Sequence, residues 1–181
     1  MISLISVIMI AIGLSMDAFS LAILYGTLNF SKRKTLILAG SVGVFHFFMP
    51  LLGNIVGVFI FSLLTINPNL VVGIIFLIIS FQMLSSLFKE EELIDLKGIF
   101  AILLFAFTVS IDSFSVGIGL NTICNNKILA VSIFSIVSFT FTFLGISLGS
   151  VLTKRFGKVS TFIGSIVLLL LSICYLFFYN G

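Results

Sequence analysis

The sequence predicts an all-α integral membrane protein with six transmembrane helices, and three observations support this prediction. Hydrophobic residues make up 60% of the 181 residues, and charged residues make up only 8%. The mean hydropathy is +1.39. Six long apolar runs, each near the roughly 20 residues that a helix needs to cross a bilayer, take up nearly the whole chain. This composition leaves no room for a soluble catalytic domain.

Short polar segments separate the six runs. The first run has no basic region before it and is too long for the apolar part of a signal peptide, so we expect a helix and not a cleaved leader. The second run contains Pro50, which lacks a backbone N–H and predicts a kink that frees the carbonyl of His46. In chain order, the runs cover residues 2–25, 35–63, 70–88, 98–120, 128–152 and 160–178.

The basic residues predict how the chain is oriented. The segments 29–34, 89–97 and 153–158 together hold eight Lys and Arg residues, whereas the two segments between the other runs hold only Lys127. Because basic loops tend to stay in the cytoplasm, we expect both termini to lie outside it.

Two of the runs carry an aspartate inside matching ten-residue words. The first word is Leu-Ser-Met-Asp-Ala-Phe-Ser-Leu-Ala-Ile around Asp17, and the second is Val-Ser-Ile-Asp-Ser-Phe-Ser-Val-Gly-Ile around Asp112. They are identical at five of ten positions and lie 95 residues apart. A G-x-x-x-G pair also occurs in each half, at 53–57 and at 145–149, and predicts close helix packing within the chain or between two chains of a homodimer.

This similarity predicts an internal repeat. Each half contains three apolar runs, an odd number, so the second half must enter the membrane from the opposite face. We therefore predict two inverted three-helix repeats, residues 1–88 and 98–181, joined by a cytoplasmic linker at 89–97. Secondary transporters often have this design and bind their substrate between the repeats, near the bilayer midplane.

The two aspartates are the candidate substrate site. A carboxylate at the centre of a membrane helix costs about 2.5–3.5 kcal/mol on insertion scales, and no Lys or Arg lies deep in any run to pair with it. A bound cation would neutralise both acids. Helical spacing places the hydroxyls of Ser20, Thr108 and Ser115 one turn from an aspartate. Such oxygen ligands suit hard divalent ions such as Mn²⁺, Mg²⁺ or Ca²⁺.

The second run supplies further candidates. His46 is the only histidine, and it could relay protons, bind metal or simply hydrogen-bond a neighbouring helix. With Pro50 it would form a gate or a proton relay. Asn54, one turn beyond Pro50, could add an amide oxygen to the substrate site.

Several motifs are missing from the sequence. There is no P-loop, no H-E-x-x-H and no G-x-S-x-G, so we expect neither direct use of ATP nor a hydrolytic enzyme. We expect no cofactor. The basic clusters are short and adjoin the apolar runs, which argues against nucleic-acid binding.

At this point the sequence resembles a known family. The words Ser-Met-Asp-Ala-Phe, Ser-Ile-Asp-Ser-Phe and Met-Pro-Leu-Leu-Gly are similar to those of the bacterial manganese efflux pump family, MntP, in the wider LysE-type group of exporters. The resemblance extends over the whole chain. It implies export of manganese(II) across the bacterial plasma membrane, with Asp17 and Asp112 in the ion path.

Our hypothesis is a secondary transporter that exports manganese(II) by alternating access, with proton exchange as a plausible driving force. Three alternatives stay open: a non-transporting membrane scaffold, a sporulation-associated membrane protein with similar aspartate words, and an exporter of another cation or of cationic amino acids. The sequence does not separate Mn²⁺ from Mg²⁺, Ca²⁺ or Fe²⁺, and the choice of manganese follows from the resemblance.

Overall fold

The computed structural model describes residues 4–28, 30–63, 66–89, 96, 98–149, 151 and 154–178. Within these residues the chain is helical, without strands, and six helices are long and apolar enough to cross a membrane. The predicted fold class, an all-α multi-pass membrane protein, is therefore confirmed. The helices are α1 (Leu4–Gly26), α2 (Lys32–Leu63), α3 (Pro68–Ser86), α4 (Ile99–Val109), α5 (Ile111–Ile118), α6 (Leu120–Ile123), α7 (Lys127–Leu148) and α8 (Lys154–Ile173), and the π-helical segment Cys174–Phe178 continues α8.

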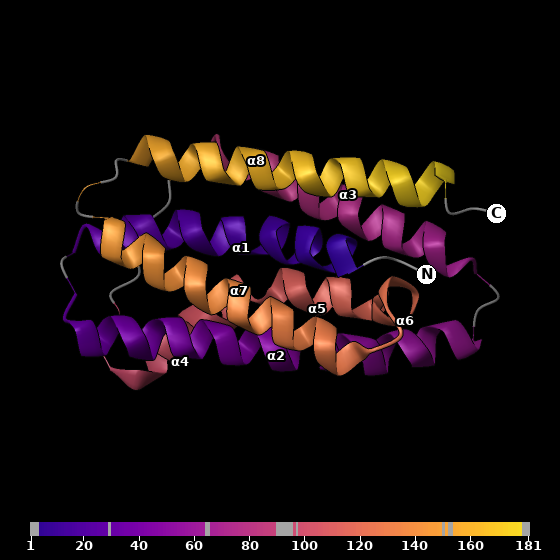
Figure 1. Ribbon diagram of the computed structural model, residues 1–181, viewed down its shortest axis with the longest axis horizontal. Helices are drawn as coiled ribbons and strands as arrows, with labels where there is room; N and C mark the ends of the chain where they lie inside the picture. The colour runs from indigo at the N-terminus through magenta and orange to yellow at the C-terminus, as the bar shows by residue number, and fades with distance from the viewer. Residues whose placement is uncertain are drawn as a thin grey trace.

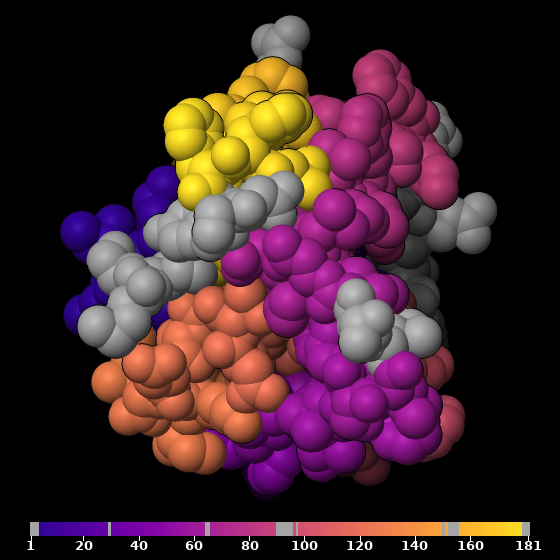
Figure 2. Space-filling model, turned by 90° about the vertical axis from the view of Figure 1, so that its right-hand side faces the viewer, coloured from indigo at the N-terminus to yellow at the C-terminus, as the bar shows by residue number. Residues whose placement is uncertain are grey.

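The long helices lie side by side in one bundle and alternate in direction (Figure 1). α1 is the most buried span and packs on α7 and α8; α2 packs on α5 and α7, and α3 packs on α8. The start of α1 and the end of α8 lie at the same end of the bundle, which Figure 2 views head-on. The basic first turns of α2 and α8 lie at the opposite end. The orientation of these two ends in a membrane stays a prediction.

The fourth span is broken, which the sequence analysis did not predict. Between α4 and α5, Ser110 has φ −102° and ψ 6°. Its hydroxyl donates to the carbonyl of Ala106 at 2.7 Å, the carbonyl that the Ser110 N–H would use in a regular helix. The Ser110 N–H donates instead to the carbonyl oxygen of Phe107, with an N···O distance of 3.1 Å. The serine side chain thus competes with the backbone for a helical acceptor, a known way for serine to disturb a helix.

The second span, in contrast, continues through the proline. α2 is one helix from Lys32 to Leu63 with Pro50 inside it. The kink expected at Pro50, which would free the His46 carbonyl, stays a prediction. Pro50 is buried, and its backbone lies against Gly117 of α5. No side chain could be accommodated at Gly117 without a shift of α2.

The two G-x-x-x-G pairs are both used inside the chain. A Cβ added to Gly53 or Gly57 would collide with the backbone of α5, at Phe114 and Ile118. On the other side of the bundle, Gly145 and Gly149 allow α7 to approach α1 in the same manner. The close approach that small residues permit therefore joins helices of different halves.

Two apolar clusters fill the core, one towards each end of the bundle. The first includes Leu14, Phe76 and Phe134, and the second includes Ala18, Val42 and Val109. Along α1, the boundary between the clusters falls between Leu14 and Ala18, at the first aspartate word. Along the fourth span, the second cluster ends at Val109, and the first resumes at Val116. Both aspartates therefore lie at the level where one apolar core gives way to the other.

The glycine contacts predict which small residues cannot be enlarged. We expect Gly53→Ala to lower the free energy of unfolding by ~1–3 kcal/mol, the usual cost of overpacking a tight contact, because the new methyl group meets the Phe114 carbonyl. Gly40→Ala on the same helix is the control: nothing lies within 4 Å of its added Cβ, and alanine favours a helix. Thermal unfolding in detergent compares the two. Equal midpoints would contradict the packing described here.

Candidate functional site

A layer of polar side chains crosses the bundle between the two apolar clusters. We name it the central polar layer. Five of its members, Ser15, His46, Ser110, Ser113 and Ser138, are fully buried. The layer consists of Ser15, Asp17, His46, Ser110, Asp112, Ser113 and Ser138.

The two aspartates of this layer come from different halves of the chain. Asp17 lies in the unbroken α1, and Asp112 lies in the first turn of α5. Both side chains are partly buried. They are close enough for the charge of Asp17 to act electrostatically on Asp112. Two like charges in such surroundings repel each other, and a cation between them would remove that repulsion.

The break at Ser110 determines the local setting of Asp112. Because a new helix begins after Ser110, Asp112 stands near a helix N-terminus, where a negative charge is favoured. One carboxylate oxygen, Oδ1, accepts the backbone N–H of Ser113 at 2.7 Å, and the Ser113 hydroxyl lies 3.5 Å from the same atom. The broken helix thus gives Asp112 hydrogen-bond donors that an uninterrupted helix would use elsewhere.

His46 connects α2 to this break. Its Nδ1 lies 3.0 Å from the Val42 carbonyl and 2.8 Å from the Ser110 hydroxyl. A carbonyl can only accept, and the Ser110 proton is used on Ala106, so both contacts are satisfied if Nδ1 carries the proton. Nε2 then keeps a lone pair, and this buried atom has no hydrogen-bond partner among the described residues. His46 therefore anchors the break in the fourth span through one nitrogen and leaves the other unused.

A simpler link joins the two halves at the same level. The hydroxyls of Ser15 on α1 and Ser138 on α7 lie 2.9 Å apart, fully buried. Ser15 precedes Asp17 by two residues, as Ser110 precedes Asp112. α1 is nevertheless continuous at Ser15.

The other predicted site residues lie in different surroundings. Ser20 is buried, with its hydroxyl facing Gly157 of α8. Ser115 is half-buried, and its hydroxyl lies 3.5 Å from the Ile111 carbonyl. Thr108 is exposed and bonds the Leu104 carbonyl at 2.9 Å. The break at Ser110 lies between Thr108 and Asp112.

Asn54 is buried in the part of α2 that follows Pro50, and within the described part of the chain its Oδ1 atom has no hydrogen-bond partner. An amide oxygen buried in this way usually costs free energy. It lies two turns from His46, whose Nε2 atom also lacks a partner among the residues that the structure describes. Both atoms are available acceptors.

Sequence reasoning missed Ser15, Ser110 and Ser138. A signal existed for the first two, because each is the serine of the Ser-x-Asp core shared by the two words. Nothing in the local sequence indicated Ser138, which contacts a residue 123 positions away.

Within the described residues, no three His, Cys, Asp or Glu side chains gather as a metal-binding group. A metal ion at this level would therefore be held by the two carboxylates together with hydroxyl, carbonyl or water oxygens. Hard divalent cations accept such ligands, and soft ions such as Cu⁺ do not.

Comparison with known proteins gives a consistent result. The family model described as "Putative manganese efflux pump" matches residues 29–176. The chain is 36% identical to a protein of Methanocorpusculum labreanum over 97% of both chains. It is 32% identical to one of Geobacillus thermodenitrificans over 96% of both, and 31% identical to one of Bacillus pumilus over 96% of this chain and 95% of the relative. All three relatives are named "Putative manganese efflux pump MntP". No solved structure matches.

The hydrogen bonds of His46 predict its tautomer. Since it is the only histidine, ¹⁵N-histidine labelling gives the signals of one imidazole ring. We expect a neutral ring at pH 7 with the proton on Nδ1 and none on Nε2. Ser110→Ala, which removes one neighbour of Nδ1, should leave this tautomer in place because the Val42 carbonyl remains. A proton found on Nε2 would contradict the assignment.

Proposed function

Since the chain belongs to the family described as "Putative manganese efflux pump", we propose that it exports manganese(II) from the cytoplasm as a secondary transporter. The ion binds between Asp17 and Asp112, and the protein exposes it to each side of the membrane in turn. The choice of manganese follows from the names of the relatives. The choice of a hard divalent cation follows from the oxygen donors in the central polar layer.

The observation that carries this proposal is the pair of carboxylates at one level of the bundle, from two halves of the chain. Both lie where one apolar cluster gives way to the other, in spans whose middle holds no Lys or Arg in the sequence. Mn²⁺ carries the two positive charges that two carboxylates require. A purely structural pair would need only hydrogen bonding and would not favour two like charges in apolar surroundings.

Contacts between the halves support the proposed inverted repeat. Phe114 follows Phe19 by 95 residues, and Gly145 follows Gly53 by 92 residues. A Cβ added to Gly145 would lie 2.9 Å from the carbonyl oxygen of Phe19. A Cβ added to Gly53 would meet the carbonyl oxygen of Phe114 in the same way. Each half thus presents a glycine of its second span to the carbonyl that follows the aspartate in the other half.

The third and sixth spans add an independent pair of contacts. The Ser80 hydroxyl donates to the Ser165 carbonyl at 2.8 Å, and the Ser172 hydroxyl donates to the Gly73 carbonyl at 2.8 Å. Ser172 follows Ser80 by 92 residues, and Ser165 follows Gly73 by 92 residues. A two-fold axis through the middle of the bundle would exchange these two hydrogen bonds, as an inverted repeat requires.

In the proposed cycle, the two halves move against each other around the central polar layer. The tight glycine contacts lie on both sides of this layer: α1 meets α7 towards the basic end, and α2 meets α5 towards the other end. Opening either contact would admit ions from one side. The break at Ser110 gives the fourth span a point of rotation beside Asp112, whereas α1 has none beside Asp17.

Proton exchange is the proposed driving force. When the metal leaves, two carboxylates remain at the same level of the bundle, and proton uptake lowers their mutual repulsion. Metal entry then displaces the protons, because a carboxylate must be ionised to bind metal. The Nε2 atom of His46 is a further proton acceptor near this level and gives the predicted relay a chemical basis. Ser20, Ser115, Thr108 and Asn54 remain proposed oxygen ligands, and Pro50 remains part of the proposed gate.

Replacing either carboxylate should abolish export. In manganese-loaded cells that lack their own exporter, we expect the chain to lower intracellular manganese, measured by elemental analysis. Asp17→Asn and Asp112→Asn should each reduce export at least about tenfold, because losing a charged ligand costs ~1.5–3 kcal/mol. Asp95→Asn, which removes an acid from the linker, is the charge-matched control and should export normally.

The same experiment separates this proposal from the scaffold alternative. If a scaffold is correct, asparagine replaces either aspartate with little loss, since packing requires hydrogen bonding and not charge. Full export by Asp17→Asn at matched membrane levels would refute the proposed mechanism. If the unmodified chain changes the content of another divalent cation and not that of manganese, the metal assignment is wrong.

A further inference from the structure

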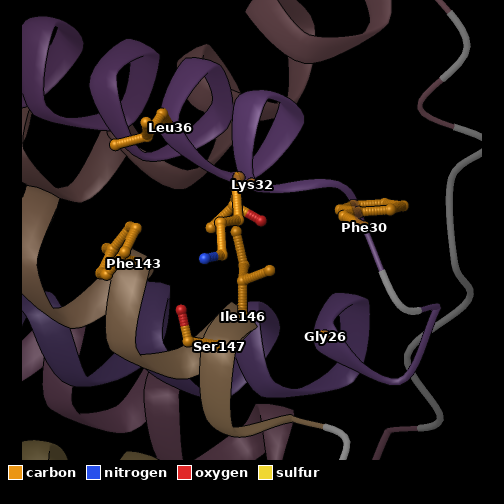
Figure 3. A pocket seen from close by; sticks show the side chains of 8 residues that line it. Gly26, Phe30, Lys32, Leu36, Phe143, Ile146 and Ser147 are labelled. Atoms are coloured by element: carbon orange, nitrogen blue, oxygen red, sulfur yellow. The ribbon is translucent and has the colours of Figure 1, made fainter.

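A cavity outside the central polar layer opens at the basic end of the bundle. It has a volume of about 410 Å³ and lies between the end of α1, the start of α2 and the end of α7. Such a volume lies in the range of small-molecule sites. Figure 3 shows the Lys32 ammonium and the Ser147 hydroxyl directed into the space between α2 and α7, with the Phe30 and Phe143 rings on opposite sides.

The polar groups of this cavity suit an anion. Lys32 supplies a positive charge, and the first turn of α2 adds the partial positive charge of a helix N-terminus. Thr35 also lines the cavity, and the residue is only 5% exposed. Its hydroxyl can donate a hydrogen bond to an oxyanion held in the cavity.

The remaining walls suit an apolar group attached to that anion. Leu36, Phe143 and Ile146 form them, and Leu36 is also exposed on the outer face of α2. Phe30 stands at the rim, where the Lys34 ammonium lies 3.9 Å from its ring centre. Because the cavity lies at the ends of the spanning helices, it is at the depth of lipid headgroups. A free anion would make no use of these apolar walls.

We propose that this cavity binds the phosphate headgroup of an anionic phospholipid, with Lys32 and Thr35 as the phosphate ligands and the first acyl carbons along Leu36. Basic pockets between membrane helices bind lipid headgroups in this way. A cation in transit would be repelled by Lys32, so the cavity is distinct from the proposed metal path. The inference goes beyond the transport function and does not depend on it.

The test is lipid retention by the purified full chain, counted by native mass spectrometry from mixed micelles. The probes are dioleoylphosphatidylglycerol, dioleoylphosphatidylcholine and inorganic phosphate. We expect one phosphatidylglycerol to be retained in preference to phosphatidylcholine. Lys32→Gln should weaken its binding about fivefold, the effect of one basic residue near a lipid surface. Arg33→Gln removes the same charge one residue away, outside the cavity lining, and should bind as the unmodified chain does.

Each other result overturns the proposal. Equal losses in Lys32→Gln and Arg33→Gln would indicate general surface charge, and equal retention of the two lipids would exclude a headgroup site. If inorganic phosphate displaces phosphatidylglycerol at equal concentration, the site takes free anions. Should Lys32→Gln fail to fold, Thr35→Val carries the test, because it keeps every charge and removes only the hydroxyl. Unchanged retention by Thr35→Val would then contradict the proposed ligands.

Discussion

Two carboxylates at one level of an apolar bundle are the constraint around which the rest of the structure is arranged. Neither Asp17 nor Asp112 can be placed in an apolar core without a large cost. The apolar core of the bundle is divided in two at this level. One apolar cluster ends before the aspartates, and the other begins after them. The central polar layer fills the gap with serines and His46. The position of the acids thus follows from the packing on both sides.

The layer is held in place by contacts between spans that are far apart in the sequence. Glycines of α2 and α7 bring these helices against the carbonyls that follow each aspartate. The Ser15–Ser138 pair and the Ser110–His46 pair join the same spans, about one turn before the carbonyls that follow the aspartates. Since each contact links one half of the chain to the other, movement of one half against the other must act on both aspartates together. Alternating access requires such coupling.

The two halves nevertheless differ at the point that matters for movement. The aspartate of the first half lies beside the Ser15–Ser138 pair in a continuous α1, whereas the aspartate of the second half lies beside the Ser110–His46 pair in a broken span. A histidine reaches further than a serine and offers a second nitrogen. We infer that the second half carries the mobile aspartate and the first half the fixed one, within the proposed mechanism.

Much of this arrangement could be predicted from the sequence. Apolar run length predicted the six spans, and the repeated words identified both aspartates and, unnoticed, the serines beside them. The break at Ser110 could not be predicted, because it depends on a side chain competing for one carbonyl and not on hydrophobic pattern, proline or glycine. The starts of α2 and α8 were placed too late, since basic residues that we assigned to loops form their first turns. Ser138 was missed because its partner is remote in sequence.

The most direct test of the central claim is to locate the ion. A crystal of the protein grown with Mn²⁺ and measured at the manganese absorption edge gives an anomalous peak wherever the ion is ordered. The account predicts one peak within coordination distance of both Asp17 and Asp112, and its loss in Asp112→Asn. A peak bound to one aspartate alone, or one at another site with the central polar layer empty, would contradict it.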